Sequence, residues 1–205
     1  ALRPSRLFDQ PLSGKGKLAA DAKHISGVDA SLALGQNTVK LNGAFGAPGE
    51  RLAWRLDGGN LATLKADLYG AVNASGVVTG TMDNPRTTFV ADANGLGWIA
   101  AQRKANNSNL HVSGEAWLAG TKEARFVEAK ASGNMARFNP AAFGSPLPGS
   151  INGAFDASGR SGADWRGALD LKGFGEPLLA WRLVSFVESD SFAHPLAASF
   201  VGRDY

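Results

Sequence analysis

The chain has 205 residues, a length that allows one or two compact domains. It has no cysteine, which excludes disulfides, thiolate metal sites and cysteine nucleophiles. Lys and Arg exceed Asp and Glu by only 3 (21 against 18) and are spread along the chain, which does not fit a nucleic-acid-binding surface.

The first feature along the chain is its densest basic stretch, which contains Lys15, Lys17, Lys23 and His24. Asp21 interrupts it, so we interpret the stretch as the solvated face of a strand and not as a phosphate-binding patch.

A β-hairpin is the clearest predicted element. Val39, Leu41 and Phe45 alternate with polar residues, as do Leu52, Trp54 and Leu56 after residues 46–49, Gly-Ala-Pro-Gly. Alternation with a period of two residues, interrupted by turn-forming residues, predicts two antiparallel strands with one apolar and one polar face.

Similar alternation predicts strands through the rest of the chain. It is weaker over residues 68–74, 87–93, 110–118 and 125–131, and clear over 151–158 and 165–172, with a turn at 159–162. Strands of about seven residues would be about 24 Å long. Helix candidates are few and short: residues 60–67, 99–105 and 140–143.

The chain also repeats itself. Phe8-x-x-Pro11-Leu12-x-Gly14 recurs from Phe143 to Gly149, and Leu-Ala-Trp-Arg-Leu occurs both at 52–56 and at 179–183. Asn-Gly-Ala-Phe occurs at 42–45 and again at 152–155. Recurrence of strand blocks predicts a repetitive all-β architecture.

These blocks, with the Leu-x-Trp-x-Leu strands and the Phe-Asn-Pro-Ala-Ala-Phe-Gly segment at 138–144, resemble the TamB family of AsmA-like envelope proteins. The resemblance implies an all-β fold: a long, curved, mostly antiparallel sheet folded into a U-shaped apolar trough, a "β-taco", with few short helices. It fades after about Val184. We expect residues 1–205 to be a single repetitive segment, internal to a longer chain, with 185–205 the least defined part.

The resemblance also implies a non-enzymatic conduit or chaperone that spans the envelope. Its cargo would be phospholipid acyl chains, moved between the inner and outer membranes, or nascent outer-membrane β-strands during protein assembly and secretion. The implied partner is a TamA-like outer-membrane barrel, contacted by regions outside this segment. The implied location is the periplasm, in a protein anchored to the inner membrane outside this segment. No cofactor and no nucleic acid are expected.

Apolar residues of the predicted strands are the candidates for the lining of the trough. They would equally form the dry core of a sandwich or closed barrel, and only the resemblance favours an open groove. The candidates are Val39, Leu41, Phe45, Leu52, Trp54, Leu56, Val72, Phe89, Val112, Phe155, Trp165, Leu169 and Leu171.

No pattern of residues predicts catalysis. His24, His111 and His194 have no second histidine or acidic pair at metal-ligand spacing, and no nucleophile elbow or phosphate-binding loop occurs. Two other classes of protein stay open as alternatives. One is a secreted β-solenoid or adhesin-like interaction protein, and the other is a carbohydrate-binding β-sandwich with Trp98 and Trp117 as its sugar platform.

Overall fold

The computed structural model describes residues 5–65, 67–98, 103–104, 106–121, 124–145, 149–161, 165–175 and 179–189. In this part of the chain, no helix has both the length and the hydropathy that membrane crossing requires.

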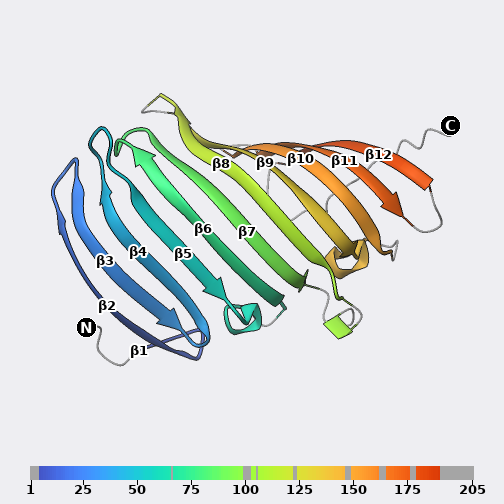
Figure 1. The fold of residues 1–205 in the computed structure, drawn as a ribbon, viewed down its shortest axis with the longest axis horizontal. Helices are drawn as coiled ribbons and strands as arrows, with labels where there is room; N and C mark the ends of the chain where they lie inside the picture. The colour runs from blue at the N-terminus through green and yellow to red at the C-terminus, as the bar shows by residue number, and fades with distance from the viewer. Residues whose placement is uncertain are drawn as a thin grey trace.

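One antiparallel sheet forms the fold, and its strands follow one another in chain order (Figure 1). β1 and β12 lie at its two ends and do not pair with each other, so the sheet is open. This confirms the predicted all-β fold. The 12 strands of the described residues are β1 (Ser5–Leu7), β2 (Gln10–Ala20), β3 (Ile25–Leu34), β4 (Asn37–Phe45), β5 (Leu52–Gly58), β6 (Tyr69–Gly80), β7 (Pro85–Gly97), β8 (Asn109–Gly120), β9 (Arg125–Phe138), β10 (Ile151–Ser161), β11 (Trp165–Gly175) and β12 (Leu179–Ser189).

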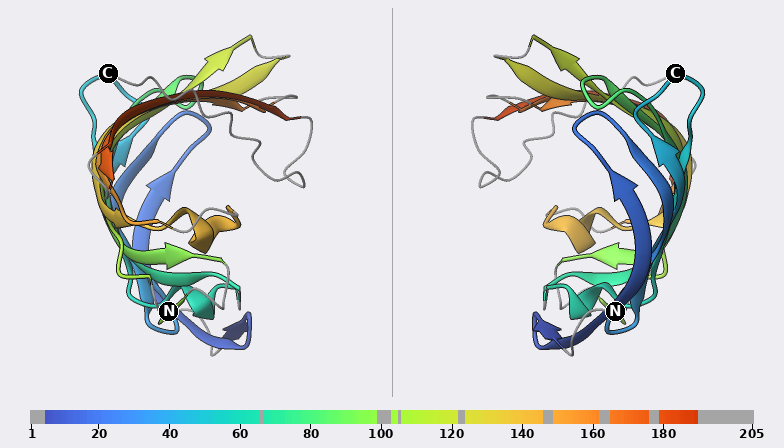
Figure 2. Two further views of the ribbon diagram at one scale, coloured as in Figure 1. Left: turned by 90° about the vertical axis from the view of Figure 1, so that its right-hand side faces the viewer. Right: turned by 90° about the vertical axis from the view of Figure 1, so that its left-hand side faces the viewer.

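The strands arch along their length, so that the sheet forms a trough that is C-shaped when viewed from its end (Figure 2). Eleven inter-strand steps of about 4.8 Å make the trough about 53 Å long. Apart from β1, the strands run from 7 residues in β5 to 14 in β9, so most are longer than predicted.

Bulges and close strand contacts produce the curvature. The pairing register shifts within β2–β3, β3–β4, β6–β7 and β9–β10, and each such irregularity bends a strand and increases its twist. Gly43 has a φ of 123°, and a Cβ there would collide with the Arg51 carbonyl oxygen. Gly70 has a φ of 103°, and its Cβ would lie 2.7 Å from the Asn94 carbonyl oxygen. Only glycine fits such positions.

The two rims of the trough are built differently. At the hairpin rim, the turns at residues 21–24, 46–51 and 81–84 are short, and only four residues (121–124) separate β8 from β9. At the opposite rim, longer connections (59–68, 98–108 and 139–150) fold back toward the opening of the trough, which Figure 2 shows for their described parts. We call these three connections the folded rim.

Two short 3₁₀ turns give the folded rim its local core. η1 (Leu61–Thr63) is capped by the side chain of Asn60, and η3 (Pro140–Phe143) by that of Asn139. Leu61 of η1 and Ala141 and Ala142 of η3 are buried. Both turns are non-α: η1 is shorter than the predicted helix at 60–67, and η3 spans 140–143 as predicted. The helix predicted at 99–105 lies mostly outside the described residues.

Candidate functional site: an open apolar trough

The candidate lining residues that the structure describes occupy one face of the sheet. Leu41 pairs with Trp54, and Val39 pairs with Leu56. Continuing across the sheet, Phe89 lies two strands beyond Trp54 in the same row. The full set with described side chains is Val39, Leu41, Phe45, Leu52, Trp54, Leu56, Val72, Phe89, Val112 and Phe155.

Trp165, Leu169 and Leu171 complete the candidate set, and their side chains lie outside the described residues. Their backbones belong to β11, where Leu171 pairs with Phe155 and Leu169 with Ala157. The pairing therefore continues the rows of the trough into β11.

The apolar rows run without a charged residue across the described sheet. One row follows Leu32, Val39, Leu56, Ala74, Ala91, Val112, Gly133 and Phe155. The next follows Ala30, Leu41, Trp54, Gly76, Phe89, Gly114, Ala131 and Ala157.

Partial exposure of these side chains distinguishes the trough from a dry core. No large side chain of the described residues falls below 2% relative exposure, and Leu32 on the apolar face is 44% exposed. Phe45, next to the hairpin rim, is the one candidate among the described residues that is buried, at 7%. In a closed sandwich, many bulky side chains of the inner face would be fully buried.

Aromatic rings pack against glycines of neighbouring strands. A Cβ on Gly76 would lie 2.7 Å from the ring of Trp54, and one on Gly114 would lie 2.8 Å from Phe89. Phe155 covers Gly133 in the same way, at 2.8 Å. The rings therefore occupy the space that a larger side chain at each glycine would fill.

A hydrogen bond fixes the orientation of the Trp54 ring. Its indole Nε1 donates to Thr87 Oγ1 at 3.1 Å, from β5 across β6 to β7. This satisfies the one polar atom of the ring while its apolar surface covers Gly76.

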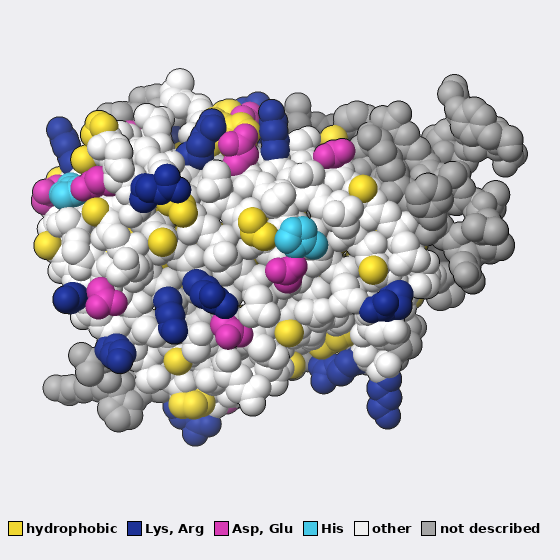
Figure 3. Space-filling model, in the orientation of Figure 1, with side chains coloured by type: hydrophobic (Ala, Val, Ile, Leu, Met, Phe, Trp, Pro, Cys, Tyr) yellow, Lys and Arg dark blue, Asp and Glu magenta, His cyan; other side chains and the backbone are white. Residues whose placement is uncertain are grey.

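The opposite, convex face is polar. Figure 3 views it from the same side as Figure 1 and shows Lys, Arg, Asp, Glu and His side chains scattered over it. Arg86 pairs with Glu115 at 3.2 Å, and His111 with Asp92 at 2.6 Å. Charges thus face water on one side of the sheet while apolar side chains line the other.

A hollow of about 740 Å³ lies over β7 to β11, and four of its lining residues, Phe89, Gly114, Ala131 and Ala157, belong to the second apolar row. Sequence reasoning named Phe89 but missed Gly114, Ala131 and Ala157, because small residues carry little hydrophobic signal. Their place on the apolar face of alternating strands is the signal that could have found them.

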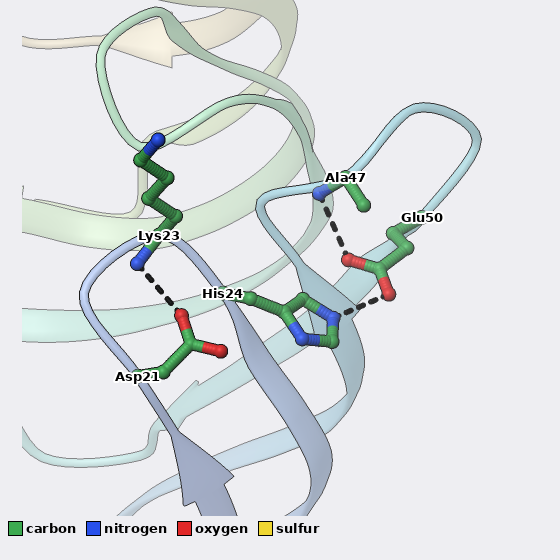
Figure 4. A network of polar contacts seen from close by, with 5 residues as sticks. All are labelled: Asp21, Lys23, His24, Ala47 and Glu50. Carbon is green, nitrogen blue, oxygen red and sulfur yellow. Dashed lines mark hydrogen bonds and ion pairs between the residues drawn. The ribbon is translucent and has the colours of Figure 1, made fainter.

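At the hairpin rim, two turns are joined by side chains (Figure 4). His24 Nε2 lies 2.6 Å from Glu50 Oε1, and the other Glu50 oxygen accepts from the Ala47 amide at 3.0 Å. The hydrogen bond with His24, followed in weight by that from Ala47, lowers the pKa of Glu50 from its ordinary value, while burial opposes the shift. Asp21 accepts from the Lys23 amide at 2.8 Å and so shapes the first turn.

Neither described histidine belongs to a metal site. His24 and His111 each contact one carboxylate, and the described residues contain no group of three or more His, Cys, Asp or Glu that could hold a metal ion. His194 lies outside the described residues.

The geometry does not favour the two alternative classes of protein. The antiparallel order of the strands differs from the parallel coils of a β-solenoid. Trp117 lies on the convex face, 5.2 Å from the Arg86 guanidinium, near the hairpin rim. Trp98 packs edge-on against Phe143 at the other rim, so the two indoles do not form one sugar platform.

Comparisons with known proteins add one match. The family model described as "TamB, N-terminal domain" matches residues 5–188. No curated protein and no solved structure matches the chain.

Proposed function

Because the chain belongs to the TamB family, through that family's N-terminal domain, we propose that it is a non-enzymatic conduit segment that shelters apolar cargo in its trough. The family places the chain in the translocation and assembly system of the bacterial envelope. Family membership alone does not identify the cargo, so the proposal rests on the geometry of the trough in this chain.

The continuous, unsealed apolar face is the observation that carries the proposal. Uncharged rows cross the described sheet from strand to strand, and their side chains keep part of their surface exposed. Burying a methylene group contributes about 0.8 kcal/mol, so a tail with about ten methylenes inside the trough would gain on the order of 8 kcal/mol. An open slot lets a tail move along the rows without returning to water.

Phospholipid acyl chains are the cargo that this face fits best. The floor offers apolar contact and few polar groups, which suits a hydrocarbon tail. Movement between the inner and outer membranes would follow the row direction, because the rows run along the length of the trough.

A nascent outer-membrane β-strand is the second candidate cargo, supported by the free edge of β2. β1 pairs only with residues 10–12 of β2, so no described strand pairs with that edge from Ser13 to Ala20. Unpaired edges can add a guest strand. Lys15 and Lys17 on this strand oppose it, because charged side chains at an edge discourage pairing.

We place the segment in the periplasm, as one unit of a longer protein anchored to the inner membrane elsewhere. A TamA-like outer-membrane barrel would be contacted by other regions of that protein.

Lipid bound to the purified chain tests the proposal. Leu41 lies on the trough floor, and its neighbour Asn42 points to the convex face, so Leu41→Asp and Asn42→Asp form a matched pair. After incubation with phospholipid vesicles, mass spectrometry of extracts should find lipid with the wild type and with Asn42→Asp. Leu41→Asp should lose it while circular dichroism shows unchanged strand content.

Two outcomes would contradict the proposal. Wild-type chain that carries no lipid after incubation would remove the acyl-chain cargo. Loss of strand content in Leu41→Asp alone would instead support a sealed core around this position.

A further inference from the structure

We propose that the folded rim binds the anionic headgroup of an amphiphile whose tails lie in the trough. The inference rests on the proposed function, because the tails need the apolar floor. Binding of the headgroup at the folded rim would add a second contact to that of the tails with the floor, and it would give a headgroup preference that an apolar floor cannot supply.

Three exposed cations lie in the folded rim and a fourth at the adjoining end of β9, and we call them the basic lip: Lys65, Arg103, Lys104 and Arg137. Lys65 follows η1 in the connection between β5 and β6. Arg103 and Lys104 lie in the connection between β7 and β8, and Arg137 lies at the end of β9.

Local contacts hold two of these guanidinium groups at the rim. The Arg103 guanidinium lies 5.3 Å from the centre of the Tyr69 ring, a cation–π distance, and Tyr69 is 3% exposed at the start of β6. Arg137 Nε donates to the Asn107 carbonyl at 3.2 Å, which draws this side chain to the connection between β7 and β8. Both contacts leave other N–H donors of each guanidinium for a ligand.

The positive charge of the basic lip is not neutralised within the described structure. The ion pairs between described residues involve His24, Arg86, His111 and Arg125, and none of the four lip residues. Asp67, and Asp57 at the end of β5, are the described carboxylates at this rim, so the four cations outnumber them by two.

Cations at the hairpin rim are partly paired. Arg125 lies 2.9 Å from Asp83, and Arg86 at the start of β7 lies 3.2 Å from Glu115. None of the lip cations has such a partner among the described residues. A negatively charged group at the mouth of the trough therefore meets four cations outside any described ion pair at the folded rim.

The spacing between lip and floor suits one molecule with a charged head and a hydrocarbon tail. Along β5, Gly58 at the folded rim is four residues from Trp54 on the floor, or about 14 Å at 3.4 Å per residue. A fatty acyl chain covers that distance. Arginine and lysine donors match the oxygens of a phosphate, while the floor offers no charged partner to an acidic peptide. We therefore assign the lip to a phospholipid with net negative charge.

Headgroup preference tests the inference. The probes are vesicles of phosphatidylglycerol or of phosphatidylcholine with identical acyl chains, and bound lipid is counted by mass spectrometry of the full chain. The lip variant is Lys65→Gln/Arg103→Gln/Lys104→Gln. The matched variant, Lys23→Gln/Arg51→Gln/Arg125→Gln, removes the same three charges from the hairpin rim.

The wild type and the hairpin-rim variant should prefer phosphatidylglycerol by roughly tenfold, a ratio that three partly exposed charge contacts can supply. The lip variant should bind the two lipids about equally, and added salt should reduce the preference of the wild type.

A wild type that binds both lipids equally would overturn the inference, as would equal loss of preference in the two triple variants. Displacement of bound phosphatidylglycerol by polyglutamate with the tails still bound would overturn the assignment to a lipid headgroup. In each of these cases bound lipid persists, so the proposed conduit stands. Absence of any bound lipid would instead remove the conduit and the inference together.

Discussion

Glycines on the apolar face allow aromatic rings to pack close to the sheet. Gly76, Gly114 and Gly133 let aromatic rings lie against the sheet, where a larger residue would hold them away. Ring-on-glycine packing also covers backbone that glycine leaves bare, a known way of supporting glycine in a strand. The floor therefore depends on small residues as much as on bulky ones.

Gly114→Ala should destabilise the chain. Its Cβ would collide with the Lys130 carbonyl oxygen and would lie 2.8 Å from Phe89, and crowding of this kind costs about 1–3 kcal/mol. Gly59→Ala is the matched control, because no atom lies nearer than 4.0 Å to its Cβ position. Urea unfolding should show a lower midpoint for Gly114→Ala only. Equal midpoints for the two variants would mean that the ring is not held on the glycine.

At the scale of elements, the sequence predicts the hairpins best. The alternation around Trp54 predicts the pairing of β4 with β5, and Leu41 indeed lies opposite Trp54. β2 was predicted only as a solvated strand face around Lys15 and Lys17, and β3 was not predicted, because Gly and Ala dilute the alternation of both strands. The folded rim could be predicted only in part. Capping residues such as Asn60 and Asn139 indicate short helical turns. The direction in which these turns fold depends on the curvature of the whole sheet and could not be predicted.

The sequence predicts which side chains form the apolar face, but it does not predict whether that face is open or sealed. Alternation indicates which side chains share a face, since a strand has a period of two residues. It cannot indicate whether that face is sealed, because a dry core and an open trough have the same pattern. The basic lip was missed because its four residues are far apart in sequence and meet at one rim only after the sheet forms.

The contact between His24 and Glu50, which joins two turns of the hairpin rim, should make the stability of the fold depend on pH. The folded-state pKa of Glu50 is lowered, so its carboxylate stabilises the fold above its unfolded pKa of about 4.3, and the contribution is lost as pH falls through the folded value. Glu50→Gln should therefore lower the thermal midpoint at pH 7, and the difference from wild type should shrink as the pH falls below about 4.

Glu128→Gln is a suitable control, because Glu128 makes none of the ion pairs of the described residues. It should leave the midpoint at pH 7 nearly unchanged. A Glu50→Gln deficit that is constant between pH 3 and pH 7 would show that the carboxylate charge does not join the turns.

For the whole molecule, the open edges and the one-sided polarity of the sheet explain the architecture together. A sheet that is apolar on one face must bury that face against another layer, a ligand or itself. Here the described sheet curls around its apolar face, and no second layer of the described chain covers the floor. The remaining apolar exposure is what cargo would cover.

Photo-crosslinking at two adjacent positions of β7 tests this most directly. Ala91 lies in an apolar row, while Val90 is equally apolar, 43% exposed and on the convex face. With a photoreactive residue at either position and a phospholipid bilayer present, lipid adducts should form at Ala91 and be scarce at Val90. Equal adducts at both positions, or adducts at Val90 alone, would contradict an accessible trough.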